Sequence, residues 1–112
     1  MANSYGKTAE QIANSRYTAG TPEWDAFKHV YWHALMVADD FGFQWSQGLG
    51  RAHEGYSNNV DRPGDLENNR HGALIGQQFK DGRLQGDMNR YVEDFVRNGH
   101  ANTTANCRSC RP

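Results

Sequence analysis

The fold is decided by residues 21–42, which read TPEWDAFKHVYWHALMVADDFG. Thr21 followed by Pro22 is typical of the N-cap and first position of a helix, and Gly42 is a typical C-terminal stop. Between these signals, apolar residues recur at the spacing of one helix face: Trp24, Phe27, Tyr31, Leu35 and Ala38. The stretch therefore predicts a helix from Pro22 to about Phe41 whose apolar stripe faces a core.

A neighbouring stripe of the same predicted helix mixes ionisable and large apolar groups. Its members follow one another at helical spacing: Asp25, His29, Trp32, His33, Met36 and Asp40. Such a mixture is typical of a helix flank that lines a polar pocket within a core. We therefore expect a polar site beside this helix.

Helix signals continue on both sides of this segment, and the alternation typical of strands is absent. Further helices are predicted over residues 8–17, 45–56, 65–79 and 87–97. Thr8 opens the first of them in a capping box with Gln11, and Asp65 is the expected N-cap of the helix over 65–79. The sequence predicts an all-α fold, with a single small domain of about five helices over residues 1–99 and a polar C-terminal tail over residues 100–112.

Composition narrows the classes of function. The 112 residues suffice for one core, and 12 basic and 13 acidic side chains give a formal net charge of -1. A dedicated DNA-binding domain normally carries a basic excess, so DNA-specific binding is not expected. No apolar run approaches the roughly 18 residues of a membrane span. The sequence has no charged-then-apolar leader, so a signal peptide is not expected.

His29 and His33 stand four residues apart, so both side chains can reach one point beside a helix. This spacing suits a divalent metal such as zinc when a third ligand comes from elsewhere, and His53, Asp65 or Glu54 would supply it. In the alternative interpretation there is no metal, His29 is a buried, hydrogen-bonded histidine and His33 is exposed to solvent.

His53 and Glu54 are adjacent at the end of a predicted helix, where neighbouring side chains point about 100° apart. His53 is a candidate general base, because the unperturbed pKa of histidine lies near physiological pH. Glu54 would act as the acid or orient a neighbour. The alternative is an ordinary surface pair.

Asn68 and Asn69 fall in the early turns of the predicted helix over 65–79, although asparagine is a poor helix former. Two of them together imply that their amides bond to something specific. They would orient His29 or His53, or bind a substrate.

Cys107 and Cys110 form a lone CxxC in the predicted tail. With His100 they would lack one ligand of a zinc site. A tail disulfide or two free thiols are therefore favoured over a catalytic role.

Three blocks of the sequence together resemble a helical domain of bacterial secreted proteins, often found at the C-termini of Rhs-type and other polymorphic toxins. That family is usually written D-x-x-R-H-x-x-W, A-H-E and D-L-x-N-N-x-x-G. The corresponding blocks here are Asp25-x-x-Lys28-His29-x-x-Trp32, Ala52-His53-Glu54 and Asp65-Leu66-x-Asn68-Asn69-x-x-Gly72.

The chain departs from this family pattern at two positions. Lys28 replaces the arginine, which keeps the charge but loses bidentate geometry. His33 stands where the family tends to carry Asn or Ser, which weakens the zinc hypothesis. The resemblance implies an antibacterial effector, secreted or delivered into a target bacterium as part of a larger protein, and a cognate immunity protein as partner.

These observations lead to the hypothesis of a toxin domain that performs hydrolysis, on an envelope substrate in preference to RNA. The candidate residues fall into three groups: catalytic His29, His53, Glu54 and Asp65; substrate-binding Lys28, Trp32, Asn68 and Asn69; and metal-binding His29, His33 and His53. The alternative is a non-enzymatic helical binding module whose polar cluster is a structural network.

Overall fold

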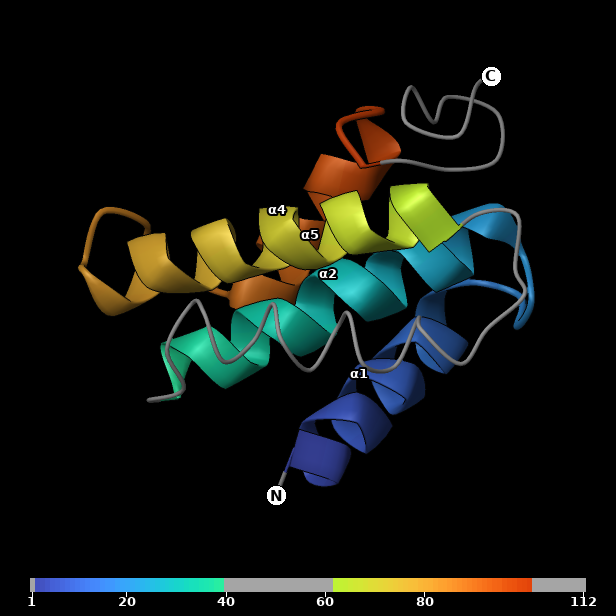
Figure 1. Cartoon of the computed structure of the whole chain (residues 1–112), viewed down its shortest axis with the longest axis horizontal. Helices are drawn as coiled ribbons and strands as arrows, with labels where there is room; N and C mark the ends of the chain where they lie inside the picture. The colour runs from blue at the N-terminus through green and yellow to red at the C-terminus, as the bar shows by residue number, and fades with distance from the viewer. Residues whose placement is uncertain (1, 40–61, 102–112) are drawn as a thin grey trace.

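The computed structural model describes residues 2–39 and 62–101 of the chain (Figure 1). Within these residues it contains four helices and no strand: α1 (Ala2–Arg16), α2 (Pro22–Ala38), α4 (Arg62–Lys80) and α5 (Met88–Arg97). The all-α prediction is confirmed for this part of the chain. The helix predicted over residues 45–56 lies outside the described residues, as do His53, Glu54, Cys107 and Cys110.

α1 begins at Ala2, earlier than the capping-box pattern predicts. The Thr8 hydroxyl donates to the carbonyl oxygen of Ser4 at 3.0 Å, so it bonds back along an existing helix instead of capping a new one. The added turn also contacts α2, because the Tyr5 hydroxyl donates to the Asp39 carboxylate. Tertiary contacts therefore extend this helix beyond its local signal.

α2 begins where its signals predict. Thr21 is the N-cap, and its hydroxyl accepts a hydrogen bond from the backbone N–H of Trp24. The helix ends at Ala38, three residues before the predicted end, and the N–H of the C-cap Asp39 donates to the carbonyl oxygen of Leu35 at 3.1 Å.

The N-cap prediction for Asp65 is wrong, because α4 begins at Arg62 and already contains Asp65. Pro63 and Gly64 read as turn residues in the sequence, yet proline is tolerated in the first turn of a helix. α5, predicted over residues 87–97, begins at Met88: Asp87 is its N-cap, and the Asp87 carboxylate accepts from the N–H of Asn89 at 3.2 Å.

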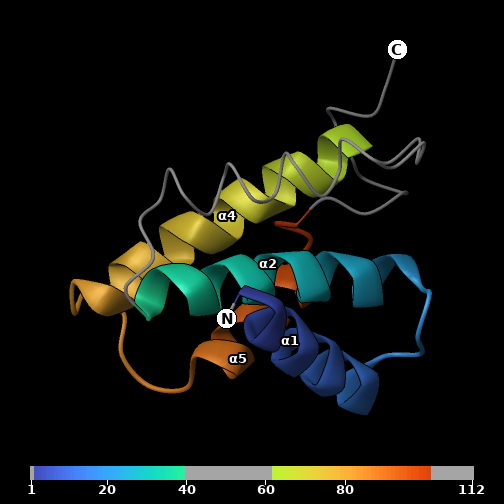
Figure 2. The same ribbon diagram turned by 60° about the horizontal axis from the view of Figure 1, so that its bottom comes forward.

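α2 is the central helix, and α1, α4 and α5 all contact it. Figure 2 shows α4 on one side of α2, with α1 and α5 on the other. α2 and α4 run in the same direction, because Val30 faces Gly72 and Ala34, one turn later, faces Gly76 (Figure 1). This parallel pair positions the candidate site.

The parallel pair is unusually close because α4 carries glycines along its contact line. A Cβ atom at Gly72 would lie 2.1 Å from the carbonyl oxygen of Val30, and one at Gly76 would lie 2.4 Å from that of Ala34. Any side chain at either position would collide with α2 backbone. Gly72, the last residue of the third sequence block, therefore lets the preceding turn of α4 press against α2.

The core lies mainly between α1, α2 and α5. Phe27 is fully buried, and its ring packs 5.6 Å from that of Tyr17 and 5.4 Å from that of Tyr31. The predicted apolar stripe of α2 thus faces the core through Phe27 and Tyr31. Ala101 is also buried within this core, so the packed domain continues beyond residue 99.

Arg16 fastens the end of α1 to α5. Its guanidinium donates to the backbone oxygen of Asn89 at 3.1 Å, lies 2.7 Å from a Glu93 carboxylate oxygen and lies 5.7 Å from the centre of the Phe27 ring. The Arg16 side chain therefore contacts both a charged residue of α5 and the ring of Phe27 in the core.

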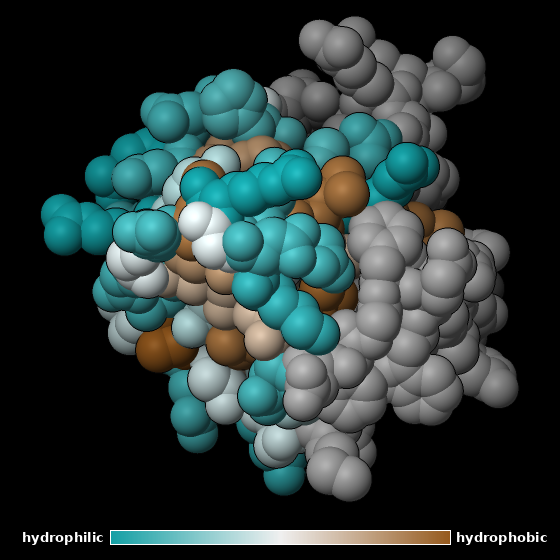
Figure 3. All heavy atoms as spheres, turned by 90° about the vertical axis from the view of Figure 1, so that its left-hand side faces the viewer, coloured by the Kyte–Doolittle hydropathy of each residue, from teal (hydrophilic) through white to brown (hydrophobic). Residues whose placement is uncertain are grey.

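The surface is mostly hydrophilic on the face shown in Figure 3, with apolar atoms visible between polar side chains. Among the described large apolar residues, Leu74 and Tyr91 are exposed. None of the described helices is long and apolar enough to cross a membrane.

Candidate functional site

A chain of three polar side chains crosses the contact between α2 and α4. His29 of α2 lies between Asp25, one turn earlier on the same helix, and Asn69 of α4. Its Nδ1 is 2.9 Å from the Asn69 Oδ1, which is hydrogen-bond distance. Its Nε2 is 3.7 Å from the Asp25 Oδ1. We refer to these three residues as the Asp25–His29–Asn69 site.

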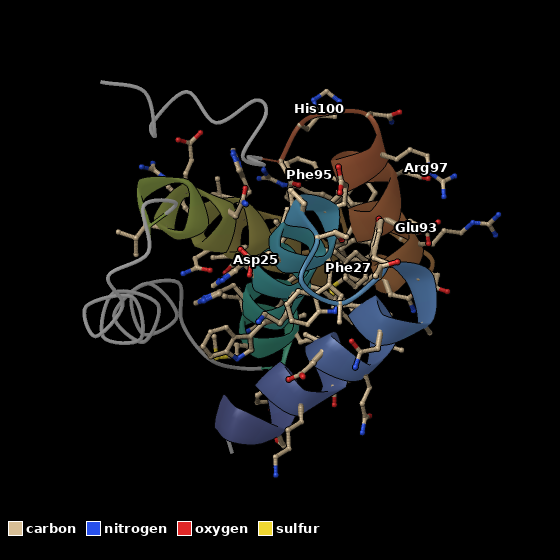
Figure 4. All side chains as sticks on the ribbon, turned by 90° about the vertical axis from the view of Figure 1, so that its right-hand side faces the viewer. Asp25, Phe27, Glu93, Phe95, Arg97 and His100 are labelled. Carbon is tan, nitrogen blue, oxygen red and sulfur yellow. The ribbon has the colours of Figure 1, made fainter. Side chains whose placement is uncertain are left out.

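The site runs from the surface into the interior. The Asp25 side chain is 34% exposed, whereas His29 and Asn69 are 3% and 1% exposed. Asp25 lies where α2 and α4 come together (Figure 4). Solvent can therefore reach the carboxylate end of the site, while the amide end is shielded from competing water.

The hydrogen bond defines the protonation of the imidazole. An amide oxygen can only accept, so Nδ1 of His29 carries a hydrogen and donates it to Asn69 Oδ1. In the neutral ring the lone pair is then on Nε2, the nitrogen that faces Asp25.

Lys28 and Trp24 border the exposed end. The Lys28 ammonium lies 3.9 Å from the Asp25 Oδ1 and 4.3 Å from the centre of the Trp24 ring. Trp24 is itself anchored, since its Nε1–H donates to Asn14 Oδ1 at 2.8 Å. Because these groups are partly exposed, each contact contributes on the order of 1 kcal/mol or less. Lys28, predicted to bind substrate, thus places a positive charge beside the carboxylate.

His33 is fully buried, which contradicts the interpretation in which it is exposed to solvent. Its ring lies 4.7 Å from that of Trp32, and the Trp32 ring lies 6.5 Å from that of His29. Trp32 also packs against Gly6 of α1. The Trp32 ring therefore lies beside both imidazoles and beside α1.

Both asparagines of α4 are buried, each 1% exposed. Of the roles that the sequence left open for Asn69, the structure shows a contact with His29. Within the described part of the chain, the Asn69 Nδ2 has no hydrogen-bond acceptor. Burial of two poor helix formers agrees with the expectation that their amides serve specific contacts.

The structure does not describe the side chains of three other predicted site residues. His53 and Glu54 lie outside the described residues. Asp65 lies in the first turn of α4, four residues before Asn69, and its side chain is not described.

The structure brings together no metal centre within the residues that it describes: no three side chains of His, Cys, Asp or Glu are grouped there. A zinc ion would need His29, His33 and a ligand from outside these residues, such as His53. Because the His29 Nδ1 is bonded to Asn69, only the Nε2 of His29 fits a metal.

Asp25 is the site residue that the sequence analysis missed as a candidate. The signal was present, because residues four apart on a helix are neighbours and Asp25 precedes His29 by four. The mixed stripe indicates Asp25 only as one of its six members. The same spacing joins Glu67 to His71, whose Nε2 lies 3.5 Å from Glu67 Oε1 on the outer part of α4.

The fold and site define the class: a small all-α domain that holds a buried, amide-bonded imidazole beneath a partly exposed carboxylate. Residues 1–103 match the family described as Domain of unknown function (DUF6973), and the chain belongs to that family. Neither a curated protein nor a solved structure matches the chain.

Proposed function

We propose that this domain is a hydrolytic antibacterial effector in which His29 is the general base. The observation that carries the proposal is the geometry of the Asp25–His29–Asn69 site. One imidazole nitrogen is bonded to a buried amide, and the other faces a carboxylate that solvent can reach. A general base needs such an oriented nitrogen within hydrogen-bond reach of the proton that it takes.

The chemistry follows from the longer of the two distances. At 3.7 Å, Nε2 of His29 and Oδ1 of Asp25 are too far apart for a direct hydrogen bond. A water molecule beside the pair can lie within hydrogen-bond distance of both atoms. Nε2 takes a proton from that water while the water oxygen bonds to the electrophilic carbon or phosphorus of the substrate. Asp25 then stabilises the imidazolium, and a second group protonates the leaving group.

The source of that second proton is proposed from the sequence. His53, Glu54 and Asp65 are the candidate acids, and Lys28 and Trp32 are the candidate substrate contacts. Lys28 supports an anionic substrate, because its ammonium lies beside the exposed end of the site.

The biological setting is proposed from the resemblance to polymorphic toxin domains and from the charge. The domain is secreted or delivered into a target bacterium as part of a larger protein, and a cognate immunity protein protects the producer. A near-balanced charge favours an envelope substrate, phospholipid or peptidoglycan, over RNA.

A second candidate function is favoured by burial. His29, His33, Asn68 and Asn69 are all at most 3% exposed. A buried polar network whose members are satisfied specifies a fold without turnover. In this alternative the domain is a non-enzymatic binding module.

The two functions separate in one variant, His29→Asn. The asparagine amide retains a hydrogen-bond donor toward Asn69 but has no basic nitrogen. His71→Asn is the matched control, because His71 is also paired with a carboxylate four residues earlier but lies on another part of α4. Each is expressed in the cytoplasm and in the periplasm of a bacterium without an immunity protein.

The proposal predicts that the unaltered domain and His71→Asn kill from the periplasm, and that His29→Asn does not although it melts like the control. Killing by His29→Asn would contradict the base assignment. Absence of killing by the unaltered domain in both compartments would contradict the effector. A network role predicts a lower melting temperature for His29→Asn and no activity to lose.

A further inference from the structure

We infer that Asn69 is a positioning residue, which holds the proton of His29 on Nδ1 and so directs all proton exchange to Nε2. The sequence left two roles open for Asn69: a substrate contact, or orientation of His29 or His53. Its effect on catalysis rests on the proposed function, whereas its effect on the imidazole does not.

The first support is the atom that Asn69 presents. Oδ1 accepts from Nδ1–H at 2.9 Å, and both side chains are almost completely buried. Water does not compete for this bond, and a buried hydrogen bond is costly to leave unmade. The tautomer with the hydrogen on Nδ1 is therefore selected by the protein.

The second support is the rigidity of the scaffold that carries the two residues. His29 directly precedes Val30, whose carbonyl oxygen lies against Gly72, and Asn69 is three residues before Gly72. The backbones of α2 and α4 are thus in contact within one turn of the hydrogen bond. Groups held this way keep their geometry as a substrate arrives.

The consequence concerns both protonation states of the ring. The neutral ring carries its hydrogen on Nδ1, and the imidazolium adds one on Nε2, beside the Asp25 carboxylate. The Nδ1 hydrogen remains on Asn69 throughout. Proton exchange therefore occurs only at the end of the site that solvent reaches.

The test is a ¹⁵N NMR measurement on the whole chain labelled at its five histidines. The His29→Asn variant lacks the two ring nitrogens of His29, so it identifies their signals. In the unaltered protein we expect the neutral ring to carry its hydrogen on Nδ1 and to have an unprotonated Nε2. An Nε2–H tautomer in the neutral ring would overturn the inference.

Two variants at Asn69 test the cause. Asn69→Leu keeps the approximate shape and removes the acceptor, so the neutral ring should move toward the Nε2–H tautomer. Asn69→Asp keeps an acceptor and should retain Nδ1–H. If Asn69→Leu retains the tautomer of the unaltered protein, Asn69 is not its cause. If that variant does not fold, the Asp variant and the unaltered protein still decide, because a loss of Nδ1–H in either refutes the inference.

Killing assays keep this inference distinct from the proposed function. A base in the wrong tautomer loses on the order of 10²–10⁴-fold in rate, so Asn69→Leu should kill far less than Asn69→Asp. An Nδ1–H tautomer in a domain that kills nothing leaves the inference intact and refutes the function. An Nε2–H tautomer in a domain that kills through His29 refutes the inference and the use of Nε2 as the base, and leaves the effector function standing.

Discussion

Gly72→Ala tests the close approach of α2 and α4, on which the site depends. The added methyl group would lie 2.1 Å from the carbonyl oxygen of Val30, whereas ordinary contacts begin at 3.4 Å. The Cβ is fixed by the α4 backbone and the oxygen belongs to the α2 backbone, so neither can turn aside. α4 must therefore move away from α2 by about 1.3 Å, the difference between these two distances, beside the His29–Asn69 hydrogen bond.

The magnitude is a balance of opposing terms. Alanine in place of glycine favours a helix by about 1 kcal/mol. Overpacking costs about 1–3 kcal/mol, and a buried hydrogen bond stretched beyond 3.5 Å costs about 1–3 kcal/mol more. We therefore expect the free energy of unfolding to fall by about 1–5 kcal/mol.

The assay is urea unfolding followed by circular dichroism, with Gly6→Ala of α1 as the matched control. A Cβ at Gly6 would lie 3.7 Å from the Trp32 Nε1, an ordinary contact. This helical glycine should gain about 0.5–1 kcal/mol on substitution. If Gly72→Ala were as stable as the unaltered protein or more so, the proximity of the two helices would be refuted.

Three further outcomes follow from the described contacts. Burial raises the pKa of Tyr17 and of Tyr31 above 10.0. The stability contributed by their neutral forms is therefore complete below pH 10 and is lost as the pH rises through the raised values. The melting temperature, measured at increasing alkaline pH, should fall in that range, and should fall less steeply in Tyr17→Phe. The Tyr17 hydroxyl is buried with no hydrogen-bond partner in the described part of the chain; at neutral pH Tyr17→Phe should therefore melt at the same temperature or higher, and a drop would reveal a bond. Arg16→Ala should lower the free energy of unfolding by about 1–3 kcal/mol in urea titrations, because it removes the ion pair with Glu93, the hydrogen bond to Asn89 and the contact with the Phe27 ring. The Arg97 side chain is 69% exposed, so Arg97→Ala should change the free energy of unfolding by less than about 0.5 kcal/mol.

Local signals predicted the parts of the fold that depend on local chemistry. Thr21 and Pro22 set the start of α2, and Asp87 sets that of α5, because each supplies a cap within its own first turn. The helix start predicted at Thr8 was wrong, because Thr8 lies inside α1, where its hydroxyl donates to the carbonyl oxygen of Ser4.

The candidate site was predictable only along one helix. Asp25 and His29 share a face by spacing alone, and the polar stripe of α2 indicated a site there. The partner of His29 was narrowed to a few alternatives but not fixed, since Asn69 is 40 residues away. Its register against α2 is decided by the absence of side chains at Gly72 and Gly76, and the closeness that this allows is visible only once the two helices are packed.

The central claim is the direct bond between the His29 imidazole and the Asn69 amide, and a double-mutant cycle measures it. The free energies of unfolding of His29→Leu, Asn69→Leu and the double variant would be compared with that of the unaltered protein. Partners in a buried hydrogen bond should show a coupling of about 1–3 kcal/mol. Additive effects within about 0.5 kcal/mol, as for distant residues, would contradict the account.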